Sequence, residues 1–350
     1  MKYRQRSEEN TLSILNTLRK KYKTSHFRLS DYILPNNYYS TLLPKLSDYK
    51  KEEKFIITCE IKANVTENKM KLLRDSGFIE VQPGIESFST NVLKKMDKGV
   101  SAIQNVFCLL MGKKYGIQVN YNFLYGFPDD EYEEYKEMIS TIPKLYHLNP
   151  PAGKLEVAIT RFSPLQNTPE KFGIPSNLKH HPGYDVIFSD KFLSNHDFSL
   201  KNFSYYFEKE YNPSKSLQRA YNVILNQLKY WEYISQNRVV DLLYETKDDK
   251  IIFYDNRYNE EFEEIEMDYE YSLIYCAIDN SITKIFSLKK KFNTIISNSK
   301  IDQILHELNS RHLILKDKDS VIGLALNEVN KHDFFYKSTS ERFSKSKALA

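Results

Sequence analysis

Up to about residue 165, the spacing of hydrophobic positions switches repeatedly between the period of a helix and that of a strand. Ser7 and Thr66 are suitable N-caps for two of the helices, and Gly77 is a suitable C-terminal stop. The pattern predicts helices at 8–22, 38–49, 66–76, 90–96, 101–115 and 129–142, and strands at 26–30, 55–61, 78–82, 117–124 and 155–162. Because strands alternate with helices, we predict an α/β fold with a parallel sheet, either a barrel or an open doubly wound sheet.

The rest of the chain consists of an aromatic stretch interrupted by prolines and then a second unit. One long helix is predicted at 212–233, with Asn212 as its N-cap and Pro213 as its first helical residue. The second unit is predicted to contain strands at 239–245, 251–255, 313–316 and 321–326, and helices at 269–276, 281–287 and 300–311. Helices followed by a hairpin are typical of a winged-helix domain. The polar residues after Asn330 predict a frayed tail.

The composition indicates a soluble globular protein, since 41% of the 350 residues are hydrophobic, 27% are charged and the net charge is +4. No apolar run approaches the roughly 18 residues of a membrane span. The N-terminal MKYRQRSEEN also lacks the apolar core of a signal peptide. We therefore expect a cytoplasmic protein with no membrane partner. Positive and negative charges are interspersed rather than gathered on a basic face, which disfavours nucleic acid as a partner.

Polar side chains recur near the carboxyl ends of the predicted strands, where parallel α/β folds bind ligands. Glu60, Lys62 and Asn64 share one face of their strand, and Glu80, Gln82, Gly84 and Glu86 share one parity of the next. Asn120 and Asn122 follow, and the last strand carries Glu156 and Arg161. This repetition predicts a polar cavity for a charged ligand. A hydrogen-bonded layer beneath the mouth of a barrel explains it equally well, and Gly84 and Gly126 fit either close ligand approach or simple turns.

The sequence offers no metal site of its own. Cys59, Cys108 and Cys276 lie far apart, no CxxC or CxxxCxxC occurs, and core thiols in a reducing compartment are the favoured interpretation. The adjacent His180 and His181 have poor spacing for zinc. Nucleotide-binding and nucleophile-elbow motifs are absent from the sequence.

Several sequence segments are more specific for a protein family: EIKANV at 60–65, IEVQPGIESFSTNVLKKMDKGV at 79–100, QN at 104–105, NYNFLYGFP at 120–128, HLNPP at 147–151 and RFSP at 161–164. Together they resemble the radical S-adenosylmethionine (SAM) proteins that mature ribosomally made peptides. The most similar subgroup is the cobalamin-binding one called RiPP maturation radical SAM protein 1. The resemblance covers about residues 1–175 in order and continues weakly into the winged-helix-like unit, which is similar to small peptide-docking domains.

The resemblance implies a partial (β/α)6 barrel, a [4Fe–4S] cluster, SAM, cobalamin as methyl carrier, and a precursor peptide as substrate. It places Glu60, Glu86 and Ser87 near the methionyl amine or the ribose. Gly126, Phe127 and Pro128 flank the adenine, and Asn122 and Arg161 line the same mouth. The resemblance and the strand pattern together predict a set of cofactor-binding residues: Glu60, Lys62, Gly84, Glu86, Ser87, Asn122, Gly126, Phe127, Pro128 and Arg161. Neither the pattern nor the resemblance assigns a catalytic residue or a metal ligand.

Members of the family carry a cobalamin domain, a first strand and a CxxxCxxC loop ahead of a segment like Met1–Ser7. We therefore expect a barrel that lacks its first strand at 1–175, a mostly helical connection at 176–235, a winged-helix-like α+β domain at 236–330 and a flexible tail at 331–350. In one hypothesis a separate chain supplies the cobalamin domain and cluster loop, and this chain is inactive alone. In a second, it is a catalytically dead peptide-binding scaffold. In a third, the winged helix binds nucleic acid, although the charges of the helix at 300–311 sum to zero.

Overall fold

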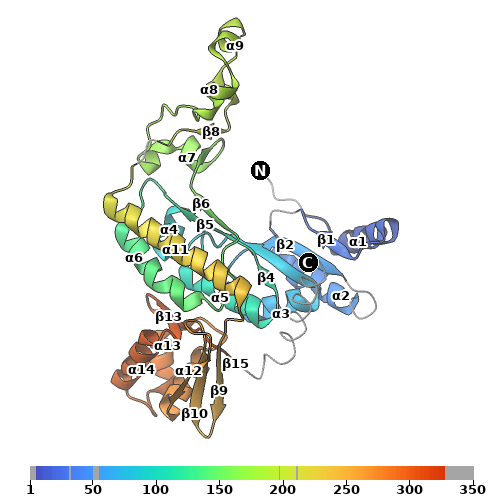
Figure 1. Ribbon diagram of the computed structural model, residues 1–350. Helices are drawn as coiled ribbons and strands as arrows, with labels where there is room; N and C mark the ends of the chain where they lie inside the picture. The colour runs from blue at the N-terminus through green and yellow to red at the C-terminus, as the bar shows by residue number, and fades with distance from the viewer. Residues whose placement is uncertain (1–4, 31–32, 50–54, 197, 210–211, 328–350) are drawn as a thin grey trace.

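The computed structural model describes residues 5–30, 33–49, 55–196, 198–209 and 212–327. Figure 1 shows a sheet with helices packed around it, an arm that extends away from the sheet, and a C-terminal α/β unit on the opposite side from the arm. Across the described part of the chain, no helix is both long enough and apolar enough to cross a membrane.

A parallel sheet forms the centre of the N-terminal part. Its four strands lie in the order of the chain: β1 (His26–Arg28), β2 (Ile56–Ile61), β3 (Phe78–Pro83) and β4 (Gln118–Val119). All three neighbouring pairs are parallel. The sequence-based prediction of an α/β fold with a parallel sheet is therefore confirmed.

Helices between the strands begin and end largely where the sequence predicts. They are α1 (Glu8–Tyr22), η1 (Asn36–Tyr39), α2 (Leu42–Tyr49), α3 (Glu67–Asp75), α4 (Thr90–Lys95) and α5 (Ala102–Lys114). The Ser7 side chain accepts a hydrogen bond from the backbone of Asn10, and Thr66 does so from Lys69. Gly77 has φ +95°, and a Cβ there would lie 2.5 Å from the Phe55 carbonyl oxygen. Only glycine fits that position.

In the N-terminal part, two predicted strands are each divided in the structure. Residues 117–124 form β4 and then β5 (Asn122–Tyr125), which pairs in parallel with β6 (Gly153–Glu156). Residues 155–162 end β6 and begin β7 (Ile159–Thr160). The first break arises because Asn120 N donates to Val81 O, whereas Leu124 N donates to Glu86 O. The backbone before the break is thus paired with β3, and the backbone after it is paired with the segment that follows β3.

Helices α6 (Tyr132–Thr141) and α11 (Lys215–Asn237) pack on each other beside the sheet, as Figure 1 shows, and η2 (Ile142–Leu145) follows α6. The predicted N-cap of α11 is wrong. Ser214, not Asn212, caps the helix, because its hydroxyl accepts a hydrogen bond from Leu217 N. Pro213 consequently lies before the helix rather than in its first turn.

Between β6 and α11 the chain forms the arm. Its elements are β7, α7 (Pro164–Asn167), η3 (Pro169–Phe172), α8 (Gly183–Ile187), α9 (Asp190–Asn195), α10 (Leu200–Phe203) and β8 (Tyr206–Phe207). Strand β8 pairs antiparallel with β7, and the base of the arm has a small core of its own around Ile159, Leu165 and Phe207. The arm is therefore held to the body at the carboxyl end of β6.

The C-terminal unit has two sheets and three helices. One sheet has the order β11 (Glu263–Met267), β10 (Lys250–Asp255), β9 (Leu242–Lys247), β15 (Leu326–Asn327), and the other β12 (Thr283–Lys284), β14 (Ser320–Gly323), β13 (Ile314–Asp317). The helices are α12 (Tyr269–Ile278), α13 (Ile285–Phe292) and α14 (Asn298–Ser310). The two predicted hairpins are present. Strands β11 and β12 were not predicted: β12 lies within the predicted helix at 281–287, and that helix begins only at Ile285. The predicted strand at 321–326 is divided into β14 and β15. Identification of the unit as a winged helix stays a prediction, and the predicted tail lies outside the described residues.

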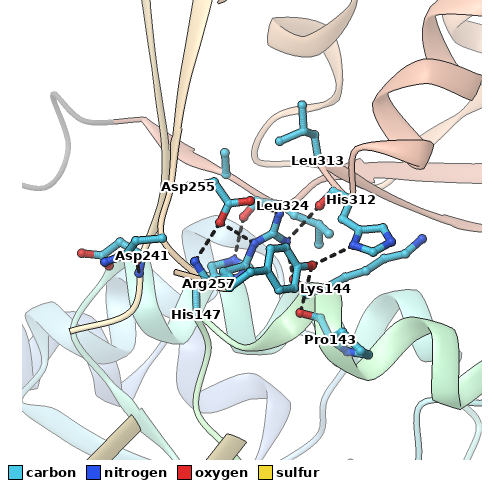
Figure 2. A network of polar contacts seen from close by, with 12 residues as sticks. Pro143, Lys144, His147, Asp241, Asp255, Arg257, His312, Leu313 and Leu324 are labelled. Atoms are coloured by element: carbon cyan, nitrogen blue, oxygen red, sulfur yellow. Dashed lines mark hydrogen bonds and ion pairs between the residues drawn. The ribbon is translucent and has the colours of Figure 1, made fainter. Parts of the chain in front are cut away.

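A buried polar network joins the C-terminal unit to the first part of the chain (Figure 2). The Arg257 side chain is fully buried and forms a two-armed ion pair with Asp255, Nε to Oδ1 at 2.9 Å and Nη2 to Oδ2 at 2.7 Å. Its Nη1 also donates to the carbonyl oxygens of Lys144, in η2, and His312. Nearby, Lys113 Nζ lies 2.7 Å from Asp241 Oδ1. The two units are thus fixed by charge-assisted contacts that exclude water.

His147 lies in the same junction, and its titration makes the stability of the folded protein depend on pH. Its Nε2–H donates to Leu324 O at 2.9 Å, and the buried Nδ1 has no hydrogen-bond partner in the part of the chain that the structure describes. Burial, with Arg257 and Lys113 nearby, lowers the pKa of His147 well below its ordinary value. The unfolded chain therefore binds a proton below about pH 6.5 that the folded chain does not. The contribution of neutral His147 to the free energy of unfolding is therefore fully present above that pH and is lost as the pH falls.

We expect the free energy of unfolding to fall by up to about 1.4 kcal/mol for each pH unit below 6.5 through this histidine alone. The His147→Gln variant keeps an amide donor near Leu324 and does not titrate, so its free energy of unfolding should depend less on pH. Urea denaturation of both proteins at pH 7 and pH 5 measures the difference. Equal pH dependence in the two proteins would contradict the prediction.

Candidate functional site

A cavity of about 420 Å³ lies where β2 and β3 end and β5 begins. Its lining residues are Ile33, Glu60, Ile61, Lys62, Ala63, Asn64, Gln82, Pro83, Gly84, Glu86, Lys98, Gly99, Val100, Tyr121 and Asn122. Carboxyl ends of parallel strands meet at one edge of a sheet, so side chains from different strands converge there. Of the expected set, the structure brings together Glu60, Lys62, Gly84, Glu86 and Asn122.

The alternation of β2 places its charged residues at the cavity. Cys59 and Ile61 are buried against the helices, whereas Glu60 is half-buried and Lys62 is exposed. The structure gives the side chains of Glu60 and Lys62 no hydrogen-bond or ion-pair partner within the described residues. One negative and one positive group on the same wall are thus available to a ligand.

An ion pair also lines the cavity. Lys98, in the loop between α4 and α5, contacts Glu86 with 2.8 Å between Nζ and Oε1. The Glu86 side chain is 19% exposed and the Lys98 side chain 32%. With the amides of Asn64, Gln82 and Asn122, the cavity presents both charges and several hydrogen-bonding groups. Such a lining suits a zwitterionic ligand with hydroxyl groups.

Glu86 adopts an unusual backbone conformation, with φ +58°. This left-handed region is unfavourable for a residue with a side chain, and such residues are concentrated at functional sites. The Glu86 carbonyl accepts a hydrogen bond from Leu124 N at 2.8 Å, which ties the residue to β5. Its conformation is therefore imposed by the surrounding structure.

Ser87 does not line the cavity. Its side chain is fully buried, its hydroxyl lies 3.3 Å from Met138 Sδ, and the same hydroxyl accepts a hydrogen bond from Ser89 N. The adjacent Glu86 and Ser87 side chains thus have different surroundings.

Gly126, Phe127 and Pro128 form a turn after β5 that also lies outside this cavity. Asp130 Oδ2 accepts hydrogen bonds from Gly126 N at 3.0 Å and from Phe127 N at 2.8 Å. The hydroxyls of Tyr135 and Tyr221 donate to the same oxygen. Pro128 instead borders a separate hollow of about 290 Å³ next to Ile159 and Phe172. The turn is rigidly held, but it belongs to another part of the strand-end surface.

The expectation that Arg161 lines the same mouth as Asn122 is not met. Arg161 lies in the arm, where its Nε donates to Ser204 O and its Nη2 to Lys201 O, both at 2.6 Å. The chain turns away between β6 and β7, so residue 161 is carried with the arm. Its guanidinium stabilises the fold of the arm.

Sequence reasoning missed Lys98 and Tyr121, and it left Asn64 and Gln82 outside the expected set. Asn64 and Gln82 carry the parity signal already used for Glu60 and Gly84, so the strand pattern could have included them. Lys98 has no such signal, because its position depends on how the loop after α4 folds back over the strand ends.

The described residues do not fit an iron–sulfur cluster. The [4Fe–4S] cluster that the sequence resemblance implies would need three thiolates close together. Cys59 and Cys108 are buried in the core, as predicted, and burial raises the pKa of Cys108 to about 12. Cys276 is exposed on α12, which corrects the core-thiol prediction for that residue. Nowhere in the described chain do three His, Cys, Asp or Glu side chains gather as a metal site.

Comparison with known proteins gives one sequence match. No protein-family model matches the chain. The chain is 32% identical over 89 residues, which are 25% of its length, to an uncharacterized methyltransferase of Pyrococcus horikoshii. The match covers 19% of the length of that curated relative.

Among solved structures, the chain resembles radical SAM enzymes at low similarity. The radical SAM methyltransferase TsrM of Kitasatospora setae aligns over 48% of this chain and 34% of its own, with 14% identity and a TM-score of 0.40. The cobalamin-dependent radical enzyme OxsB aligns over 87% and 41%, with 14% identity and a TM-score of 0.35. Coproporphyrinogen III oxidase of Escherichia coli aligns over 92% of this chain and 81% of its own, with 11% identity and a TM-score of 0.34. Scores this low carry no conclusion about the chemistry of this chain.

Proposed function

We propose that the cavity binds SAM and that the chain is part of a radical-SAM-type enzyme that modifies, by methylation or otherwise, a ribosomally made peptide. The observation that carries the proposal is the lining of the cavity. Glu60 and Lys62, whose side chains have no partner among the described residues, lie with the Glu86–Lys98 ion pair at the ends of parallel strands. The sequence motifs of the barrel and the match to a methyltransferase support it. The cluster thiolates, and cobalamin, are then supplied by protein outside these 350 residues.

Each charged residue has a definite task in this proposal. Glu60 and Glu86 attract the ammonium and sulfonium charges, and Lys62 pairs with the carboxylate. The amides of Gln82 and Asn122 bind ribose hydroxyls. SAM supplies a methyl or deoxyadenosyl group when bound. Because the described residues do not fit the cluster, we assign no catalytic step to this chain.

Isothermal titration calorimetry with SAM tests the binding site. A lost hydrogen bond to a charged group costs about 1.5–3 kcal/mol, so we expect Glu60→Ala and Glu86→Ala each to weaken affinity by about 10- to 100-fold. Glu80→Ala is the matched control, because Glu80 lies on β3 but does not line the cavity. Absence of SAM binding to the wild-type chain, or equal affinity in all three variants, would refute the proposed site.

Anaerobic reconstitution tests the supply of the cluster from outside. Incubated with iron and sulfide, the 350-residue chain should gain no brown chromophore and should not convert SAM to deoxyadenosine. Cluster formation or SAM cleavage by the chain alone would show that its cysteines suffice and would overturn the need for a partner.

The C-terminal unit supports a second candidate function, that of a peptide-binding scaffold without chemistry. Strand β11 is the outer strand of its sheet, and Glu263, Glu264 and Glu266 are exposed on it. The segment 260–270 contains seven acidic residues and no basic one. An exposed edge pairs with an extended strand, and its acidic side chains favour a basic one.

Fluorescence anisotropy with labelled peptides tests this candidate. A ten-residue peptide of alternating lysine and valine should bind, whereas its glutamate–valine counterpart should not. The double change Glu263→Lys/Glu264→Lys should weaken binding at least about tenfold, since it reverses the electrostatic complementarity. Glu8→Lys/Glu9→Lys on α1, far from the unit in Figure 1, makes the same change of +4 in net charge and controls for it. Equal binding of both peptides would contradict a docking role for β11.

Nucleic acid remains the weakest proposed partner. Each basic residue of the helix predicted at 300–311 is already in an ion pair, Lys300 with Glu270 and Arg311 with Glu307. Phosphate binding needs an excess of free cations, which this helix does not present.

A further inference from the structure

The segment from Pro83 to Ser89, which delivers Glu86 to the cavity, is irregular. Ile85 N donates to Pro83 O at 2.9 Å, and Ser87 N donates to Ile85 O at 2.6 Å. Glu86 itself has φ +58°. Short local hydrogen bonds of this kind do not by themselves keep a side-chain-bearing residue in the left-handed region, so another group must hold it there.

One such group is Leu124 N, which donates to the Glu86 carbonyl. A second is the side chain of Asn105, which is fully buried on α5. Its Nδ2 donates both of its hydrogens, to Ile85 O at 2.8 Å and to Ser87 O at 2.9 Å. These are the carbonyls on either side of Glu86. A single amide group therefore bridges the residues before and after it.

The orientation of the Asn105 amide follows from its partners. Oδ1 is buried and has no hydrogen-bond partner among the described residues. In the flipped orientation this oxygen would face two carbonyl oxygens, which only accept hydrogen bonds. The donor end must therefore face the segment. Helix α5 is itself fixed at its start, where Ser101 N donates to the Gln104 side chain.

We infer that Asn105 is a positioning residue: by bridging the carbonyls of Ile85 and Ser87 it holds Glu86 left-handed and keeps its carboxylate in the cavity, 2.8 Å from Lys98 Nζ. The bearing on SAM rests on the proposed function, whereas the effect on Glu86 does not. A merely structural Asn105 would stabilise the core without controlling the direction of Glu86.

Crystal structures of the ligand-free Asn105→Ala and Asn105→Ser variants decide the conformational part. In Asn105→Ala we expect Glu86 to leave the left-handed region and its contact with Lys98 to be lost. The serine variant can donate one hydrogen bond and serves if the alanine variant does not fold. An unchanged Glu86 backbone in either folded variant would overturn the inference, as would a failure of both variants to fold, since Asn105 would then act on the whole core.

A double-mutant cycle on SAM affinity decides the functional part. We expect Asn105→Ala to weaken SAM binding about tenfold in the wild type and not at all in the Glu86→Ala background, because the residue acts through Glu86. The same loss in both backgrounds would overturn the inference. Should the wild type not bind SAM, the proposed function fails, while the ligand-free structures still decide the role of Asn105.

Ser76→Ala is the matched control for the loss of a buried polar side chain. Ser76 is fully buried and donates to Leu43 O or Leu72 O, each at 2.7 Å, away from the cavity. This variant should lower the free energy of unfolding and leave both SAM affinity and the Glu86–Lys98 contact unchanged.

Discussion

Arg257→Met is expected to lower the free energy of unfolding by about 3–5 kcal/mol, the cost of leaving one member of a buried ion pair without its partner. The Arg257 side chain is fully buried, and that of its partner Asp255 is 6% exposed. The substitution also removes the donor for the Lys144 and His312 carbonyls (Figure 2). Guanidinium chloride denaturation of both proteins at pH 7 measures the change.

Two further variants separate the ion pair from general effects of losing an arginine. Arg311→Met removes an exposed arginine paired with Glu307 and should cost less than about 1 kcal/mol. Asp255→Leu/Arg257→Met removes both buried charges and should recover part of the stability lost in the single variant. A loss below about 1 kcal/mol in Arg257→Met would mean that the network does not hold the junction.

The junction has a consequence for the proposed function. Arg257 reaches across to η2, which continues from α6, and Lys113 of α5 pairs with Asp241 before β9. The same helix α5 carries Asn105, which donates to the carbonyls of Ile85 and Ser87 on either side of Glu86. A peptide docked on the C-terminal unit would therefore lie at a fixed position relative to the strand ends rather than on a flexible tether.

Features set by neighbouring residues could be predicted from the sequence. The caps at Ser7 and Thr66 need only a hydroxyl three positions before a free backbone N–H. The parity of β2 places Glu60 and Lys62 on one face whatever surrounds the strand. These local rules account for most of the helices, the parallel sheet and half of the expected cavity residues.

Features set by distant contacts could not be predicted. The strand at 117–124 divides because its partner changes from Val81 to Glu86, and no local signal marks that change. Strand β11 was missed because its acidic positions read as a loop, and only Ile265 and Met267 are buried, in the core of the C-terminal unit. Arg161 lies outside the expected site because the chain enters the arm after β6.

Trp231→Ala is expected to have an effect as large as the loss of Arg257, by a different cause. Trp231 is fully buried on α11, and its Nε1 donates to Leu148 O at 3.0 Å. Its ring centre lies 6.2 Å from that of Phe88, two residues after Glu86, and 6.1 Å from that of Tyr146. Removing a large buried aromatic ring costs about 3–5 kcal/mol through lost burial and the cavity left behind.

Comparison of three substitutions on α11 identifies the cause of the lost stability. Trp231→Phe keeps most of the apolar volume but leaves the buried Leu148 carbonyl unpaired, so about 1–3 kcal/mol should be lost. Tyr233→Ala is the control on the same helix; Tyr233 is 62% exposed, and the change should stay within about 0.5 kcal/mol. Because Phe88 loses its support in Trp231→Ala, SAM affinity should fall with stability in that variant but not in Tyr233→Ala. Losses of similar size in Trp231→Ala and Tyr233→Ala would instead show that α11 is destabilised as a helix, independently of the core that it covers.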